Sequence, residues 1–235
     1  MTSEPPRVRA IVPMKPLDSA KSRLARSLSP DRRAVLTLAM LAHVLQTAGE
    51  AEGVAEVSVI GGDEAVRRVC DRLGVPWTPE SNPHPNLNRA LGEAFNASAR
   101  DGLDAALFLP ADLPGLGAAD VAALVTAWGG PSRSGEGRFV IAPDRAGEGT
   151  NALVIPAGVA FEPELGPGSF ERHLAQAARL GLPPSVCRSV GLLDDVDTPD
   201  DLDRLLALHP DWWQRAEATC ASLGVSPLPA ERPRG

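Results

Sequence analysis

A basic segment near the start of the chain has the composition of an anion-binding loop. Of the 23 Lys and Arg residues only Lys15 and Lys21 are lysines, and both lie in "PMKPLDSAKSRLA". Eight basic residues fall between positions 7 and 33, where only two aspartates oppose them. In a chain of net charge −7 such a segment attracts anions locally, and a lysine ammonium can meet a phosphate oxygen as a compact point charge. A solvated basic loop without a ligand is the alternative interpretation.

Two acidic motifs offer carboxylates for a divalent cation. Asp112 lies in "ADLPGLG", directly after the apolar run "ALFLP", and a carboxylate at the end of a strand can hold Mg²⁺ against nucleotide phosphates. The later motif "LDDVDTP" contains Asp194, Asp195 and Asp197, one of which is a candidate second ligand. A turn cap at Asp112 and ordinary helix-start chemistry in the later motif are the alternatives.

A third pair of motifs, "GEGTNAL" and "GPGSFERH", combines glycines with hydroxyl groups. Gly166, Gly168 and Ser169 precede an expected helix, whose free N–H groups could bind a second anion. Thr150 adds a hydroxyl beside a glycine-rich turn. A Gly-Pro turn with a serine cap would look the same in the sequence.

Several common catalytic signatures are missing from the chain. There is neither a G-x-x-x-x-G-K-[ST] motif nor a complete G-x-G-x-x-G motif, which argues against a P-loop protein or a dinucleotide dehydrogenase. None of the four histidines stands in a Ser-His-Asp or Cys-His order. Phosphoryl transfer to an acceptor that is already anionic needs no strong protein base, because positioning and charge neutralisation suffice.

The elements that must position these residues alternate between strands and helices. Such alternation predicts an α/β fold, a single Rossmann-like domain whose mainly parallel sheet has helices on both faces. We expect this domain to span residues 1–209, with a partly disordered extension over 210–235. The expected strands are 8–13, 56–61, 75–78, 104–110, 138–143, 151–156 and 185–190. The expected helices include 30–48, 63–74, 86–100, 169–181 and one that starts at 198–199.

Bulk properties exclude some classes of function. An acidic surface argues against binding to nucleic acid or to a membrane surface. The three cysteines form no C-x-x-C pair, so neither a zinc site nor a redox dithiol is expected, and reduced thiols in a cytoplasmic protein fit this usage. The sequence leaves open whether the chain is a monomer or a homodimer.

Taken together and in order, the motifs resemble a known enzyme family. "VPMKPLDSAKSRLA", "LPADLPGL", "APDRAGEGTNAL", "GPGSFERHLAQA" and "LLDDVDTPDDL" are similar to those of the 2-phospho-L-lactate / phosphoenolpyruvate guanylyltransferases. These enzymes make the guanylylated phospho-acid precursor of the deazaflavin coenzyme F-420. The resemblance covers roughly residues 8–208 and implies a nucleotidyltransferase domain that uses GTP and Mg²⁺.

The resemblance also implies roles for individual residues, motif by motif. The triphosphate contacts, which would neutralise charge during transfer, are Lys15, Lys21 and Arg23. The residue near the guanine or ribose is Asn88. The metal ligands are Asp112 and Asp197, with Asp195 as the alternative to Asp197. The contacts to the phospho-acid are Thr150, Gly166 and Ser169.

The sequence alone is also compatible with other functions. One is a nucleotidyltransferase of the same fold that takes CTP or a molybdopterin-type acceptor. Another is a non-catalytic module that binds a phospho-ligand, although such a module needs no metal carboxylates beside a lysine pair. The motifs do not choose among phosphoenolpyruvate, 2-phospholactate and 3-phosphoglycerate, and they do not identify the guanine contacts.

Overall fold

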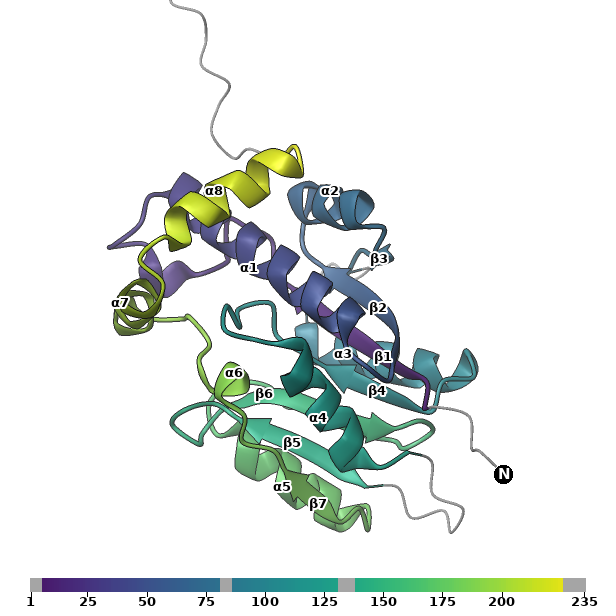
Figure 1. The fold of residues 1–235 in the computed structure, drawn as a ribbon. Helices are drawn as coiled ribbons and strands as arrows, with labels where there is room; N and C mark the ends of the chain where they lie inside the picture. The colour runs from purple at the N-terminus through teal and green to yellow at the C-terminus, as the bar shows by residue number, and fades with distance from the viewer. Residues whose placement is uncertain (1–5, 81–85, 131–137, 226–235) are drawn as a thin grey trace, which may run out of the picture.

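A computed structural model describes residues 6–80, 86–130 and 138–225 of the chain. Its centre is a seven-stranded sheet in the order β3-β2-β1-β4-β6-β5-β7 (Figure 1). Helices pack on both faces of this sheet, as the alternating pattern predicts. The strands are β1 Val8–Met14, β2 Val54–Gly61, β3 Trp77–Thr78, β4 Ala105–Phe108, β5 Phe139–Pro143, β6 Thr150–Pro156 and β7 Pro184–Val186.

The sheet is mainly parallel, as expected, with one reversed strand. β1 pairs in parallel with β2 and β4, β2 with β3, and β5 with β7. β6 lies between β4 and β5 and is antiparallel to both. The beginning of β6 therefore lies at the sheet edge where β4 ends, and where open α/β sheets usually bind ligands.

The helices divide into two layers because each strand sends alternate side chains to opposite faces. On β1, Val8, Ala10 and Val12 belong to the core beneath α1, α2 and α4, whereas Ile11 belongs to the core beneath α3 and α5. The helices are α1 Pro30–Glu50, α2 Glu64–Leu73, α3 Leu87–Arg100, α4 Ala118–Trp128, α5 Ser169–Arg179, α6 Val190–Leu193, α7 Pro199–Leu208 and α8 Trp212–Ser222, with a 3-10 turn η1 at Ser22–Leu24. Within these described elements, no helix is long and apolar enough to cross a membrane.

The two helix starts predicted from Ser-Pro and Thr-Pro pairs are confirmed. The Ser29 side chain accepts a hydrogen bond from the Arg32 N–H before α1. Thr198 caps α7, and the Asp201 carboxylate returns a bond to the Thr198 N–H, which completes a capping box. This reciprocal cap fixes the backbone directly after Asp197.

Two expectations about the end of the chain need correction. The strand expected over 185–190 is shorter, because Val190 already begins α6. The extension beyond residue 209 is not a tail throughout, because α8 packs along α1 (Figure 1). Trp212, Ala216 and Cys220 are buried, and their spacing of four residues is helical, a pattern that the Pro-rich end of the sequence obscured. Residues 226–235, where disorder was also expected, lie outside the described part.

Candidate active site

Part of the basic segment lines a cavity beyond the carboxyl end of β1. Lys15, Lys21 and Arg23 contribute to this cavity, whose volume is about 370 Å³, and so do Asp112 and Asp197. Lys15 and Arg23 are exposed to solvent, so both cations are available to a ligand there. We call this space the first cavity.

Other charges of the basic segment serve structural contacts, so the expected attractor of eight charges is not one patch. Arg9 pairs with Glu56 at 2.6 Å and with Asp101 at 2.7 Å, and Arg32 pairs with Glu217 at 3.4 Å. For Arg9 the physical reason is its place on β1: at about 3.3 Å per residue, it lies about 13 Å along the strand from Pro13, the first residue of β1 that lines the cavity. Local anion attraction rests on the residues that follow the strand.

Lys21 occupies an unusual position within the first cavity. Its Nζ atom donates to Asp112 Oδ2 at 2.5 Å and to Asp197 Oδ1 at 2.8 Å, and its side chain is only 7% exposed. Burial alone lowers the pKa of Lys21, but the two carboxylates outweigh burial and raise it above the ordinary value. Its φ is 51°, the single positive φ of a non-glycine residue in the described ranges. The ammonium is therefore charged and fixed between two acids.

Asp112 and Asp197 are brought together by the backbone as well as by Lys21. The Val196 N–H donates to the Asp112 carbonyl at 3.1 Å, which joins the loop after β4 to the segment before α7. Burial alone would raise the pKa of Asp197, but Lys21 and then Arg23 lower it below the ordinary value. The second oxygen of Asp112, Oδ1, is buried and has no partner among the described residues.

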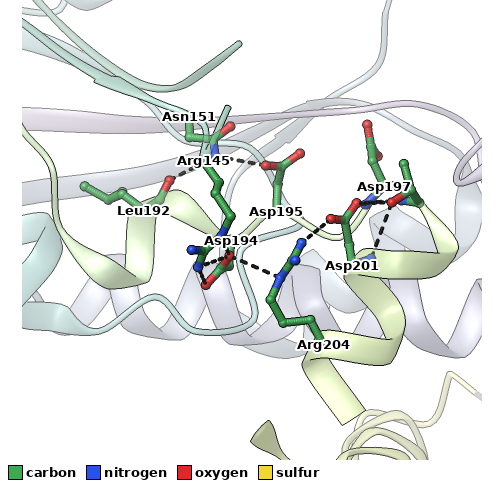
Figure 2. A network of polar contacts seen from close by, with 9 residues as sticks. Arg145, Asn151, Leu192, Asp194, Asp195, Asp197, Asp201 and Arg204 are labelled. Carbon is green, nitrogen blue, oxygen red and sulfur yellow. Dashed lines mark hydrogen bonds and ion pairs between the residues drawn. The ribbon is translucent and has the colours of Figure 1, made fainter. Parts of the chain in front are cut away.

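Asp195 lies in a different environment from Asp197. Its carboxylate accepts from Asn151 Nδ2 at 3.1 Å, and the same amide donates to the Leu192 carbonyl at 2.9 Å (Figure 2). Burial, and next the charge of Asp112, raise the pKa of Asp195 to about 6. The acids of "LDDVDTP" are thus not interchangeable, since Asp197 shares the ammonium with Asp112 and Asp195 does not.

Asp194 belongs to a salt-bridge chain that lies beside the acid pair. Arg145 donates to both oxygens of Asp194 at 2.6 Å, and Arg204 bridges Asp194 at 3.6 Å and Asp201 at 2.5 Å (Figure 2). Asp201 also accepts from the Asp197 N–H at 3.1 Å. The chain connects the β5–β6 turn to the start of α7, so Asp194 is a structural acid and not a ligand of the first cavity.

A second cavity, of about 650 Å³, adjoins the first and contains the predicted phospho-acid contacts. Thr150, Gly166 and Ser169 line it together with Asn151 and Asp195. The two cavities have four lining residues in common, which form the boundary between them: Arg23, Phe108, Leu165 and Asp197. Ligands bound in the two spaces would therefore meet beside Asp197 and Arg23.

The helix start beside the second cavity is less open to an anion than the sequence suggested. The Ser169 N–H donates to the Gly166 carbonyl at 3.0 Å, and the Phe170 N–H donates to the Glu148 carbonyl at 3.1 Å. Gly166 has φ 118°, which favours glycine at this turn. Because these first N–H groups already have partners, the polar groups open to this cavity are side chains, among them the hydroxyls of Thr150 and Ser169 and the guanidinium groups of Arg23, Arg145 and Arg204.

The structure adds His173 to this hydroxyl pair, which the sequence reasoning did not assign to the site. Ser169 Oγ lies 3.0 Å from Thr150 Oγ1, and Thr150 Oγ1 lies 3.0 Å from His173 Nδ1. Thr150, Ser169 and His173 are all buried, and burial lowers the pKa of His173 to about 4. The spacing of Ser169 and His173, four residues apart on one helix, was the available signal.

Asn88, expected near the guanine or ribose, has both amide atoms engaged by the backbone. Its Oδ1 accepts from the Leu165 N–H at 2.9 Å, and its Nδ2 donates to the Leu165 carbonyl at 3.5 Å. Since Leu165 lines both cavities, Asn88 holds their common wall in place. A base contact would require these bonds to exchange, so the guanine contact of Asn88 stays a prediction.

The geometry combines a cavity lined by basic residues, an acid pair and an adjoining second cavity, and comparison with known proteins identifies the family. Residues 8–233 match the family model described as "Guanylyl transferase CofC like". The chain belongs to this guanylyl transferase family.

Named relatives agree with this guanylyl transferase assignment, and a solved structure shares the fold. The chain is 40% identical over 201 residues to a phosphoenolpyruvate guanylyltransferase of Sphaerobacter thermophilus, covering 86% of this chain and 93% of that one. It is 42% identical over 201 residues to one of Rubrobacter xylanophilus, covering 85% and 94%. A solved nucleotide-diphospho-sugar transferase structure from Desulfovibrio desulfuricans shares the fold, with TM-score 0.70, 16% identity and coverage of 92% and 96%.

The acid pair of this guanylyl transferase fits a divalent cation in part. In residues 6–80, 86–130 and 138–225, no cluster of three or more His, Cys, Asp or Glu side chains is arranged for a metal ion. However, Asp112 offers a buried oxygen that no described residue contacts by a hydrogen bond, and both acids already surround a positive charge. Mg²⁺ is commonly held by one or two carboxylates together with substrate phosphates, without an all-protein cage. The donor set therefore suits Mg²⁺ when a nucleotide is bound.

Proposed function

We propose that this guanylyl transferase moves GMP from GTP to the phosphate of phosphoenolpyruvate, or of 2-phospho-L-lactate, and releases diphosphate. The observation that carries the proposal is the pair of adjoining cavities with Arg23 and Asp197 on their common boundary. The names of the relatives from Sphaerobacter and Rubrobacter support phosphoenolpyruvate as the acceptor. The product would serve the biosynthesis of the deazaflavin coenzyme F-420.

On the nucleotide side, the triphosphate of GTP would enter the first cavity. Lys15 and Arg23 are exposed there and would contact its oxygens directly. Lys21 would join them only by exchanging a carboxylate for a phosphate, because Asp112 and Asp197 hold its ammonium. All three cations reduce the negative charge that accumulates as diphosphate leaves.

Asp112 and Asp197 are the proposed metal ligands, with Asp195 as the alternative to Asp197. When bound, Mg²⁺ supplies positive charge that neutralises phosphate oxygens and the departing diphosphate. The fixed position of Lys21 between the acids keeps them close before a cation arrives, since each would otherwise repel the other. Asn151 holds Asp195 beside the pair.

On the acceptor side, Thr150, Gly166 and Ser169 would hold the phospho-acid in the second cavity. One of its phosphate oxygens attacks the α-phosphorus of GTP, the new P–O bond forms, and the bond to diphosphate breaks. The attacking oxygen is already ionised at pH 7, so no protein base has to remove a proton. His173 is unsuited to such a role, because both ring nitrogens are hydrogen-bonded within the protein.

A nucleotide and acceptor panel tests this function. The purified protein is incubated with Mg²⁺, with GTP or CTP, and with each phospho-acid in turn, and products are read by mass. We expect GTP with phosphoenolpyruvate or 2-phospholactate to give a guanylylated diphosphate diester. Product from CTP or a molybdopterin-type acceptor would contradict the assignment, and binding without turnover would indicate a phospho-ligand module.

Compartment and assembly are further parts of the proposal. The described structure contains three free cysteines, Cys70, Cys187 and Cys220, which suits the reducing cytoplasm. We place the enzyme there, with GTP and a three-carbon phospho-acid as its small-molecule partners. Light scattering of the purified protein would decide between a monomer and a homodimer.

A further inference from the structure

We propose that His173 is a positioning residue that makes the Thr150–Ser169 hydroxyl pair a proton donor toward an anionic oxygen in the second cavity. This inference deepens the proposed function and rests on it for the identity of the ligand, a phosphorylated carboxylic acid. The geometry around the ring carries the inference, beginning with the backbone that fixes its tautomer.

The Glu164 backbone determines which ring nitrogen of His173 carries the proton. The Glu164 N–H donates to Nε2 at 2.9 Å, so Nε2 presents its lone pair. The ring must then be neutral with its proton on Nδ1, and the low pKa of His173, about 4 because of burial, agrees with a neutral ring. Nδ1 therefore donates to Thr150 Oγ1, at 3.0 Å.

A proton count shows what this donation does to the two hydroxyls. Thr150 and Ser169 carry one hydroxyl proton each, and one of these forms the 3.0 Å bond between their oxygens. Since His173 supplies its own proton to Thr150, the second hydroxyl proton has no acceptor among the residues that the structure describes. With the opposite tautomer, Thr150 would donate to Nδ1 and Ser169 to Thr150, and no proton would remain.

The surplus proton lies where an anionic ligand can use it. Thr150 and Ser169 are 7% and 1% exposed, and both line the second cavity. A hydroxyl donor is worth most to a charged oxygen when water is excluded, because the buried donor otherwise stays unpaired. The tautomer of a ring behind the cavity wall therefore decides whether the wall attracts or repels an anion.

Two substitutions separate the two hydrogen bonds of the ring. In His173→Asn the side-chain amide N–H lies near the place of Nδ1 and can still donate to Thr150. In His173→Gln the amide oxygen reaches the place of Nε2 and can accept from Glu164, but the donor to Thr150 is lost. Phe161→Leu is the packing control, because Phe161 contacts the ring, with centroids 5.6 Å apart, and bonds to neither hydroxyl.

Steady-state kinetics with GTP and phosphoenolpyruvate should distinguish these variants by their KM for phosphoenolpyruvate. We expect His173→Gln to raise KM for phosphoenolpyruvate by about tenfold or more, the effect of one hydrogen bond to a charged group, with KM for GTP and kcat nearly constant. His173→Asn should restore most of the loss, and Phe161→Leu should lower the melting temperature without the selective rise in KM. Equal KM values for His173→Gln and His173→Asn would overturn the inference.

The tautomer can be read independently of turnover. Long-range ¹H–¹⁵N spectra of the wild-type protein at pH 7 should show His173 with a protonated Nδ1 and a bare Nε2. A protonated Nε2 overturns the inference even if the enzyme is active. If instead the tautomer is as stated but phosphoenolpyruvate neither reacts nor binds in calorimetry, the proposed acceptor fails while the hydroxyl geometry stands.

Discussion

Lys21→Met should destabilise the protein strongly, although it replaces a charged side chain by an apolar one of similar length. The ammonium of Lys21 contacts Asp112 at 2.5 Å and Asp197 at 2.8 Å, and its side chain is 7% exposed. Removing one member of a fully buried ion pair costs about 3–5 kcal/mol, but the Asp112 and Asp197 side chains are 21% and 44% exposed. Water compensates part of their charge, so the loss here should be about 2 kcal/mol. We expect a loss of this size in urea unfolding at pH 7 with a chelator present. The positive φ of Lys21 is retained by methionine, so backbone strain does not enter the difference.

Lys15→Met is the matched control for this measurement. Lys15 lies in the same loop but is exposed, and exposed charges usually contribute less than about 0.5 kcal/mol. Adding Asp112→Asn to Lys21→Met should recover much of the stability, because only one acid of the pair then remains charged and its repulsion from Asp112 is gone. Mg²⁺ should stabilise Lys21→Met more than the wild type, since the cation no longer competes with an ammonium. Equal losses for the two lysine variants would refute this account of the acid pair.

Three further outcomes follow from the structure. Asp112→Asn should fold and lose at least about 100-fold in kcat, because it removes a proposed metal ligand; near-wild-type turnover would exclude that role. The pKa of His173 is about 4 when folded, below its ordinary 6.5. The neutral ring therefore contributes fully to the free energy of unfolding above pH 6.5, and this contribution, about 3 kcal/mol in total, is lost as the pH falls toward 4. Urea unfolding at a series of pH values should show this loss in the wild type and not in His173→Asn. Ending the chain after residue 211 removes α8 and should lower the melting temperature sharply, whereas ending it after residue 225 should leave it within a few degrees; similar melting temperatures would show that α8 adds nothing to the core.

Much of the fold could be predicted because its signals are local. Apolar runs bounded by Gly and Pro marked most of the strands, and Ser29 and Thr198 marked the starts of α1 and α7. Asp112 could also be placed, since a residue after a buried parallel strand must lie at the ligand-binding edge. In these cases the residues that cause a strand or helix to begin or end are close to it in the sequence.

The rest of the site depends on contacts between distant segments. Lys21 reaches the acids only because its backbone adopts φ 51° and because Val196 bonds to the loop of Asp112. Nothing in the sequence around His173 reveals that Glu164 will bond to its ring. The charge of Arg9 was expected to belong to the anion site, but β1 places Arg9 away from the cavity. Such errors arise where sequence proximity and spatial proximity differ.

The reversed strand β6 has a consequence for how this enzyme can diverge. Because β6 is antiparallel to β4 and β5, its first residues, Thr150 and Asn151, reach the site from a hairpin, while the first cavity is built chiefly from the segments that follow β1 and β4. Under the proposed function, acceptor choice and nucleotide handling thus reside on separate chain segments that meet at one wall. Exchanging residues 139–179 between relatives should transplant the preference for the acid while leaving the nucleotide preference with the recipient. Evolution can accordingly change the product of such a scaffold without rebuilding its phosphate chemistry.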